Sequence, residues 1–97
     1  MVREITAREL RVRLDAGERP VIVDVREAWE LEQTRLPQAL HIPMDEIADR
    51  IGELDPRVET LVLCQSGVRS LHVARYLASH GFADAVNVAG GIAAMTW

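Results

Sequence analysis

The sequence contains one cysteine and no lysine among its 97 residues, and all of its positive charge comes from 11 arginines. A lone cysteine cannot form an internal disulfide, and it cannot supply a multi-cysteine zinc or iron–sulfur site. A chain without lysine cannot form a Schiff base with a substrate or place a P-loop lysine on a phosphate. These absences exclude disulfide-stapled folds and two lysine-dependent classes of enzyme.

Long apolar runs and dense basic clusters are also missing. No segment approaches the ~20 apolar residues that span a bilayer, and the charged start MVREITAREL does not resemble a signal peptide. We therefore expect a cytoplasmic protein with no membrane partner. The 15 acidic residues give a net charge of −4, so no nucleic-acid partner is expected. A hydrophobic fraction of 48% is enough for residues 1–97 to form one domain with a core.

Strand-like and helix-like segments alternate along the chain. Segments rich in β-branched and apolar residues at 21–25 and 60–64 predict buried parallel strands, and shorter segments at 2–5 and 86–88 predict two more. Helical spacing or helical turns are found between them, at 7–16 after the capping box of Thr6 and Glu9, at 26–33, at 45–54, at 69–80, and from Gly90 toward Trp97. This alternation predicts an α/β domain with a mainly parallel sheet and helices on both faces.

Cys64 is the strongest candidate for chemistry, because it stands where a buried strand passes through a short polar loop into a helix. The first N–H groups of a helix lack intrahelical partners, so a thiolate facing them is stabilised. Gly67 allows a tight turn of inward-pointing N–H groups, and Arg69 adds a permanent charge. The segment predicts Cys64 as the catalytic nucleophile and a substrate-binding loop made of Gln65, Ser66, Gly67, Val68, Arg69 and Ser70.

Other interpretations stay open for several of these residues. A lone cysteine is commonly a small buried hydrophobic residue, and the run 61–64 fits that role. Asp24 and Arg26 end a buried strand, where charges must be paired, so we expect them to give structural support, with Arg69 as a candidate partner of Asp24. His72 could act as a base, but a helix-stabilised thiolate needs none, so an exposed position is favoured. The histidines have no metal-ligand spacing, and no metal site is expected.

Four segments share one further pattern: 64–70 reads Cys-Gln-Ser-Gly-Val-Arg-Ser, 23–30 reads Val-Asp-Val-Arg-Glu-Ala-Trp-Glu, 36–43 reads Leu-Pro-Gln-Ala-Leu-His-Ile-Pro, and 88–92 reads Val-Ala-Gly-Gly-Ile. In order and spacing these segments resemble the motifs of the rhodanese sulfurtransferase family, whose active loop runs Cys-x-x-Gly-x-Arg before Ser or Thr. The family commonly has Arg after the cysteine, where this chain has Gln65. That missing cation predicts weak affinity for thiosulfate.

The resemblance implies a single rhodanese-like domain over residues 1–97, with a central five-stranded parallel sheet and helices on both faces. It implies a sulfurtransferase in which Cys64 takes a sulfane sulfur from thiosulfate, a small sulfur-containing anion, or from a persulfide donor. The Cys64 persulfide would then pass this sulfur to cyanide or to a thiol acceptor, including the thiol of a protein. The loop N–H groups would stabilise the charged sulfur, and no metal or organic cofactor is implied.

Two alternatives remain beside this interpretation. The first is a cysteine phosphatase or arsenate reductase-like enzyme, but those loops carry one more residue between Cys and Arg, and the smaller ring of 64–69 suits a single sulfur atom. The second is a non-enzymatic rhodanese-like module that binds a partner or senses persulfides. The presence of both Cys64 and Arg69 argues against this second alternative.

Overall fold

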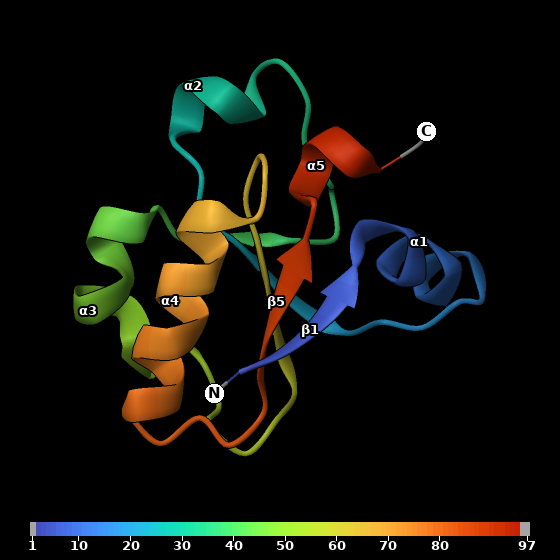
Figure 1. Ribbon diagram of the computed structural model, residues 1–97. Coiled ribbons are helices and arrows are strands. Elements are labelled where there is room, and N and C mark those ends of the chain that lie inside the picture. The colour runs from blue at the N-terminus through green and yellow to red at the C-terminus, as the bar shows by residue number, and fades with distance from the viewer. Residues whose placement is uncertain (1, 96–97) are drawn as a thin grey trace.

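A five-stranded sheet forms the centre of the computed structural model, which describes residues 2–95 (Figure 1). The strands are β1 (Arg3–Thr6), β2 (Val21–Asp24), β3 (Leu40–His41), β4 (Thr60–Leu63) and β5 (Ala85–Ala89). They lie in the order β1-β5-β4-β2-β3, and every neighbouring pair is parallel. The α/β fold with a five-stranded parallel sheet is confirmed.

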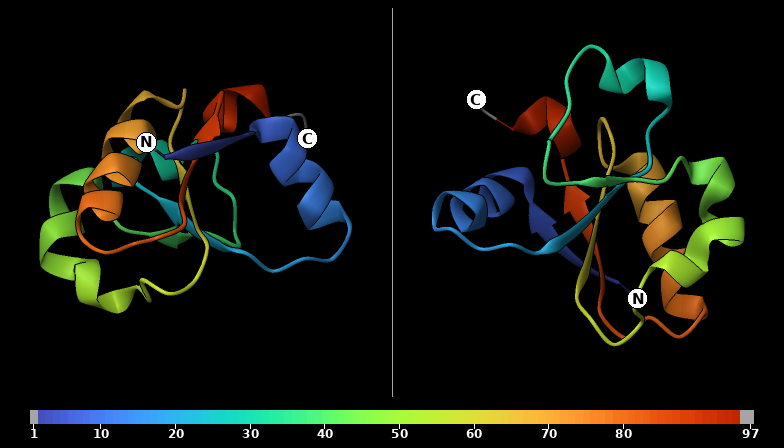
Figure 2. Two further views of the ribbon diagram at one scale, coloured as in Figure 1. Left: turned by 60° about the horizontal axis from the view of Figure 1, so that its bottom comes forward. Right: turned by 180° about the vertical axis from the view of Figure 1, so that it is seen from behind.

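Helices cover both faces of this sheet. They are α1 (Ala7–Asp15), α2 (Ala28–Leu31), α3 (Ile47–Arg50), α4 (Val68–Ser79) and α5 (Gly91–Ala94), with 3₁₀ turns η1 (Met44–Glu46) and η2 (Ile51–Glu53) on either side of α3. Figure 2 shows α1 on one side of the sheet and α3 with α4 on the other. The predicted two-sided arrangement is therefore confirmed.

The strand side chains alternate between two hydrophobic clusters, one on each face of the sheet. Val23, Val62 and Cys64 pack with residues of α3 and α4. Ile22, Leu61 and Leu63, their neighbours in sequence, pack with residues of α1 and α5. Because both faces are buried, β4 consists entirely of buried residues, as its continuous apolar run predicts.

The start of α1 confirms the predicted capping box. The Thr6 hydroxyl accepts a hydrogen bond from the Glu9 amide, and the Glu9 carboxylate accepts one from the Thr6 amide, both at 3.0 Å. These two bonds satisfy amide donors that the first turn of a helix leaves without partners. Gly17 follows this helix with φ +87°.

One predicted helix is broken in the structure. Residues 45–54 form η1, α3 and η2 in succession rather than one helix, with φ −101° at Glu46 and −112° at Arg50 where the segments meet. Apolar residues three or four apart fit 3₁₀ turns as well as an α-helix, so the spacing could not distinguish the two. The last helix ends at Ala94, and Trp97 lies outside the described residues.

None of the helices described between residues 2 and 95 combines the length and the apolar character needed to cross a bilayer. Over the same range, every buried side-chain nitrogen or oxygen has a hydrogen-bond partner. A buried polar group without a hydrogen-bond partner lowers the stability of the fold. The buried charged residues near Cys64 must therefore be paired, and their partners are described next.

Candidate active site

The loop that follows β4 lies at the upper edge of the sheet in Figure 1, below α2 and between the start of α4 and α5. Cys64 comes directly after β4, and α4 begins at Val68, so the turn between them is very short. Gly67 has φ +98°, and a Cβ at this position would lie 3.0 Å from the Gly90 amide nitrogen. The turn therefore needs glycine for its backbone conformation and for its close contact with the residues after β5.

The Cys64 sulfur lies inside this turn and is fully buried. Its Sγ accepts hydrogen bonds from the amides of Gly67 at 3.1 Å and Ser70 at 3.3 Å, and the Ser70 Oγ lies 3.2 Å away. Burial raises the pKa of the Cys64 thiol, but hydrogen bonds from the Ser70 hydroxyl and from the amides of Ser70, Gly67 and Ser66 outweigh it and lower the pKa overall. The turn thus favours a thiolate, as predicted from the strand–loop–helix sequence.

A hydrogen-bond chain continues from Ser70 across β5 to the edge strand β1. The Ser70 hydroxyl donates to Asn87 Oδ1 on β5 at 2.5 Å. The Asn87 side-chain amide donates to the Glu4 carboxylate on β1 at 2.7 Å and to the Gly67 carbonyl at 3.2 Å. Asn87 therefore binds the loop at two points, Gly67 and Ser70, and the sequence did not predict this role because a single Asn inside a short strand gives no local signal.

Arg69 does not project free into the loop. Its guanidinium makes a bidentate ion pair with the Glu30 carboxylate of α2, through Nη1 to Oε1 at 2.7 Å and through Nη2 to Oε2 at 2.8 Å. This hydrogen bonding lowers the pKa of Glu30 to about 2, so the carboxylate stays ionised. The prediction that Arg69 pairs with Asp24 is wrong, because Glu30 holds Arg69 and Asp24 has a nearer partner.

Asp24 and Arg26 pair with each other at the end of β2. Both side chains are buried, and the guanidinium donates to the carboxylate through Nε at 3.1 Å and Nη2 at 2.9 Å. Arg26 also donates to the Thr34 carbonyl at 2.8 Å and to Gln65 Oε1 at 3.5 Å. The expected pairing of these buried charges is confirmed, and it supports one side of the Cys64 loop.

The start of α5 holds the backbone of the loop. The amides of Ile92 and Ala93 donate to the carbonyls of Cys64 and Gln65, each at 3.0 Å. At Gly91, with φ +59°, a Cβ would collide with the Cys64 carbonyl and lie 2.6 Å from the Gln65 carbonyl. Gly91, the first residue of α5, is therefore part of the site because it packs directly against the backbone of the loop.

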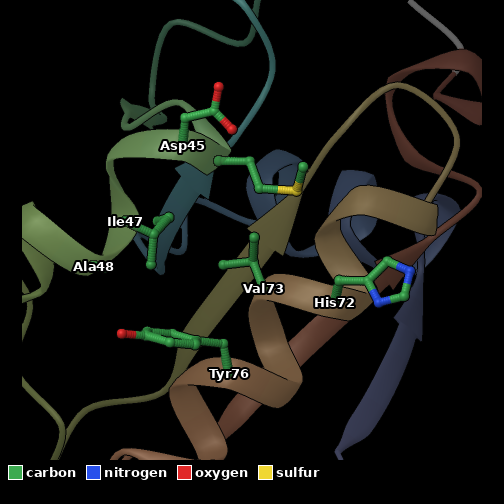
Figure 3. Close-up of a pocket in the computed structure, with 7 residues that line it drawn as sticks. Asp45, Ile47, Ala48, His72, Val73 and Tyr76 are labelled. Carbon is green, nitrogen blue, oxygen red and sulfur yellow. The ribbon is translucent and has the colours of Figure 1, made fainter.

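His72 is exposed on α4. It borders a small groove of about 170 Å³ between α3 and α4, whose other walls include Ile47, Val73 and Tyr76 (Figure 3). Figure 3 shows Ile47 and Tyr76 facing each other across this groove. The exposed helical position predicted for His72 is confirmed, and the Sγ contacts described above come from the loop instead.

A larger cavity of about 400 Å³ adjoins the loop on the α2 side. Its walls include Trp29 and Glu30 of α2, Gln65 of the loop, Ile92 of α5, and Met95, which directly follows α5. Residues 2–95 contain no group of three or more His, Cys, Asp or Glu side chains placed to hold a metal ion. The features at this edge of the sheet are thus a buried thiol, an amide-lined turn and a cavity beside it.

Comparisons with known proteins agree with this architecture. The Rhodanese-like domain family matches residues 6–96. The chain belongs to this family. Among its rhodanese-like relatives, YtwF of Bacillus subtilis, named a candidate sulfurtransferase, is 39% identical over 99% of this chain and 90% of its own length. A protein of Allochromatium vinosum named sulfurtransferase is 36% identical, over 97% of this chain and 88% of its own.

A solved structure shows the same rhodanese-like fold. The crystal structure of a rhodanese-like domain protein from Staphylococcus aureus superimposes with a TM-score of 0.90 and is 38% identical. The match covers 98% of this chain and 92% of that one. The whole sheet and its helices, including the turn that holds Cys64, therefore fall within the shared region.

Proposed function

We propose that residues 1–97 form one catalytic unit, a sulfurtransferase that carries sulfane sulfur on Cys64. The observation that supports this most directly is the burial of the Cys64 Sγ within hydrogen-bond distance of the amides of Gly67 and Ser70. Backbone N–H groups in such a turn stabilise negative charge on sulfur without a metal or a basic side chain. The names of the sulfurtransferase relatives support the same reaction class.

The first half-reaction moves one sulfur atom onto the protein. The Cys64 thiolate attacks the outer sulfur of the donor, an Sγ–S bond forms, and the donor S–S bond breaks. The electron pair of that bond leaves with sulfite when the donor is thiosulfate, or with a thiolate when the donor is a persulfide. The loop amides, already directed at Sγ, stabilise the negative charge on the resulting persulfide.

The second half-reaction returns the thiolate. Cyanide or a thiolate acceptor attacks the outer sulfur of the Cys64 persulfide, which releases thiocyanate or an acceptor persulfide. Because these 97 residues contain no second cysteine, the Cys64 persulfide has no internal thiol with which to form a disulfide. The sulfur then leaves only to another molecule, as a carrier requires.

Intact mass spectrometry tests this function. After exposure to thiosulfate or to a small persulfide, we expect the protein to gain the mass of one sulfur atom and to lose it on addition of cyanide. The Cys64→Ser variant should gain nothing. If no donor adds sulfur to Cys64, the sulfurtransferase proposal is wrong, and release of phosphate from an aryl phosphate would then favour the phosphatase alternative.

A further inference from the structure

We propose that Glu30 sets the donor specificity of this site, by occupying Arg69 and so favouring sulfane sulfur carried on an organic group over an inorganic dianion. This inference rests on the proposed sulfurtransferase function and names its substrate class. It assigns Glu30 as a positioning residue, because the carboxylate acts through Arg69 rather than on the reacting sulfur.

The cations near Cys64 are already paired with carboxylates. Arg69 donates through Nη1 and Nη2 to Glu30, whose side chain is only 11% exposed, whereas the Arg69 side chain is 32% exposed, so the carboxylate of this pair is the better shielded from solvent. Arg26 is buried against Asp24 and the Thr34 carbonyl. Each guanidinium charge is therefore offset by a carboxylate, and a dianion entering the loop must displace one of them to gain an ion pair.

The pairing of Arg69 with Glu30 affects donors differently according to their charge. Thiosulfate carries two negative charges and must approach the thiolate of Cys64, so the attack brings three charges of one sign together. A thiosulfonate carries one negative charge, and a protonated persulfide carries none. Because like charges repel more strongly where water is excluded, the pairing of Arg69 with Glu30 penalises the dianion most.

The cavity of about 400 Å³ beside the loop provides room for an organic group. It combines an indole wall from Trp29 and apolar surface from Ile92 and Met95 with polar groups, which are the side-chain amides of Gln33 and Gln65 and the paired charges of Arg26 and Glu30. Ligand sites in proteins commonly have this mixture of apolar walls and a few polar groups. An inorganic anion would leave most of this volume unused.

Thiosulfate and benzenethiosulfonate make a matched pair of donors, because both carry one sulfane sulfur and they differ by one charge and by the aromatic group. Kinetics on the full chain with cyanide as the acceptor should show higher kcat/KM for benzenethiosulfonate. Glu30→Gln keeps the oxygen that accepts the Glu27 amide at 3.0 Å but removes the charge. We expect this variant to lower KM for thiosulfate by about tenfold relative to its effect on KM for benzenethiosulfonate, so that the ratio of the two KM values shifts toward thiosulfate.

The control variant is Glu59→Gln, which changes the net charge equally and breaks ion pairs with Arg13 at 2.7 Å and Arg3 at 2.8 Å, but directly precedes β4, at the end of the strand opposite to the Cys64 loop. This control variant should leave KM unchanged for both thiosulfate and benzenethiosulfonate. The proposal is wrong if Glu30→Gln leaves KM for thiosulfate unchanged, or if it lowers KM equally for both donors. Either result would still leave sulfur transfer by Cys64 intact. If no donor loads Cys64, the proposed function itself fails.

Trp29→Ala tests the cavity independently, since Trp29 is 61% exposed and its replacement should not disturb folding. We expect a rise of about fivefold or more in the KM of benzenethiosulfonate, because the aromatic wall is lost, with thiosulfate unaffected. If Trp29→Ala changes neither KM, or changes both equally, the cavity does not select the organic group and the inference is wrong.

Discussion

At the scale of single residues, the Ser70 hydroxyl carries one proton and has two possible acceptors. In the arrangement described, the Cys64 thiol donates to Ser70 Oγ, and the hydroxyl donates to Asn87 Oδ1. When Cys64 is a thiolate, the same hydroxyl can turn its proton toward Sγ. Because Asn87 is itself fixed by Glu4 and by the Gly67 carbonyl, Ser70 joins the protonation of the sulfur to a rigid buried network.

Ser70→Ala should therefore raise the pKa of the Cys64 thiol, because the variant keeps the Ser70 amide but removes the hydroxyl that stabilises the thiolate. The pH dependence of the thiolate ultraviolet absorbance measures this change. Ser79→Ala, which removes an exposed hydroxyl bound to the Tyr76 carbonyl at the far end of α4, is the control and should not change it. An unaltered titration in Ser70→Ala would show that the loop amides alone stabilise the thiolate.

Also at this scale, the residues named by the motif could be predicted, but their partners could not. The hydrogen bonds of Cys64 and Ser70 depend on a turn that is contiguous in sequence, so the strand–loop–helix pattern was sufficient. Glu30 lies 39 positions before Arg69, and Asn87 lies 17 positions after Ser70. Which carboxylate reaches Arg69 depends on the order of the strands, and that order is not encoded by any local pattern.

At the scale of elements, the end of β2 and the start of α5 fix the loop from two sides. The Asp24–Arg26 pair forms within three residues of chain, so the local geometry outcompetes the distant Arg69 for the Asp24 carboxylate. The amides of α5 bind the carbonyls of Cys64 and Gln65 from the other side. The turn thus keeps its shape because neighbouring elements hold its backbone and one of its side chains.

Asp24→Asn tests the first of these supports. It leaves the buried Arg26 guanidinium without its counter-charge, and we expect a loss of about 3–5 kcal/mol in the free energy of unfolding, measured by chemical denaturation. The chain provides a close control in Asp55, which binds Arg57 with the same two-residue spacing but in an exposed position. Asp55→Asn should cause no measurable loss, and similar losses in both variants would contradict the assigned role of Asp24.

Gly91→Ala tests the second support. The added Cβ meets the carbonyls of Cys64 and Gln65 at a residue with φ +59°, so we expect about 3 kcal/mol of destabilisation together with slower sulfur loading. Gly17 also has positive φ, +87°, but has nothing within 4 Å of its Cβ position. Gly17→Ala should cost only about 1 kcal/mol of backbone strain, and equal costs in denaturation experiments would show that packing against the loop is unimportant.

At the scale of the whole molecule, the charged residues of the site contribute to acid stability. The pKa of Glu30 is about 2 in the folded protein and about 4.5 in an exposed glutamate, mainly because Arg69 binds the ionised form. A carboxyl with a lowered folded pKa stabilises the fold above its unfolded pKa, and this contribution is lost as the pH falls from about 4.5 toward 2. The Glu30–Arg69 pair therefore links α2 to α4 less strongly in acid.

Glu30→Gln should weaken the dependence of the free energy of unfolding on pH in this acidic range. Between pH 4.5 and 2, the wild-type protein should lose up to about 3 kcal/mol that the variant does not lose, because glutamine has no carboxyl to protonate. Urea denaturation at a series of pH values measures the difference. Two curves that remain parallel over this range would mean that the pair does not contribute to stability.

The sheet order also determines when the site can form during synthesis. β5 pairs with β1 on one side and with β4 on the other. Because β5 is the strand that β1 pairs with, β1 cannot join the sheet until residues 85–89 have emerged from the ribosome. The amides that hold the Cys64 turn come later still, from Ile92 and Ala93. A nascent chain therefore carries Cys64 for about 30 further residues as an ordinary thiol, and we expect it to gain its sulfur reactivity only when the last elements fold.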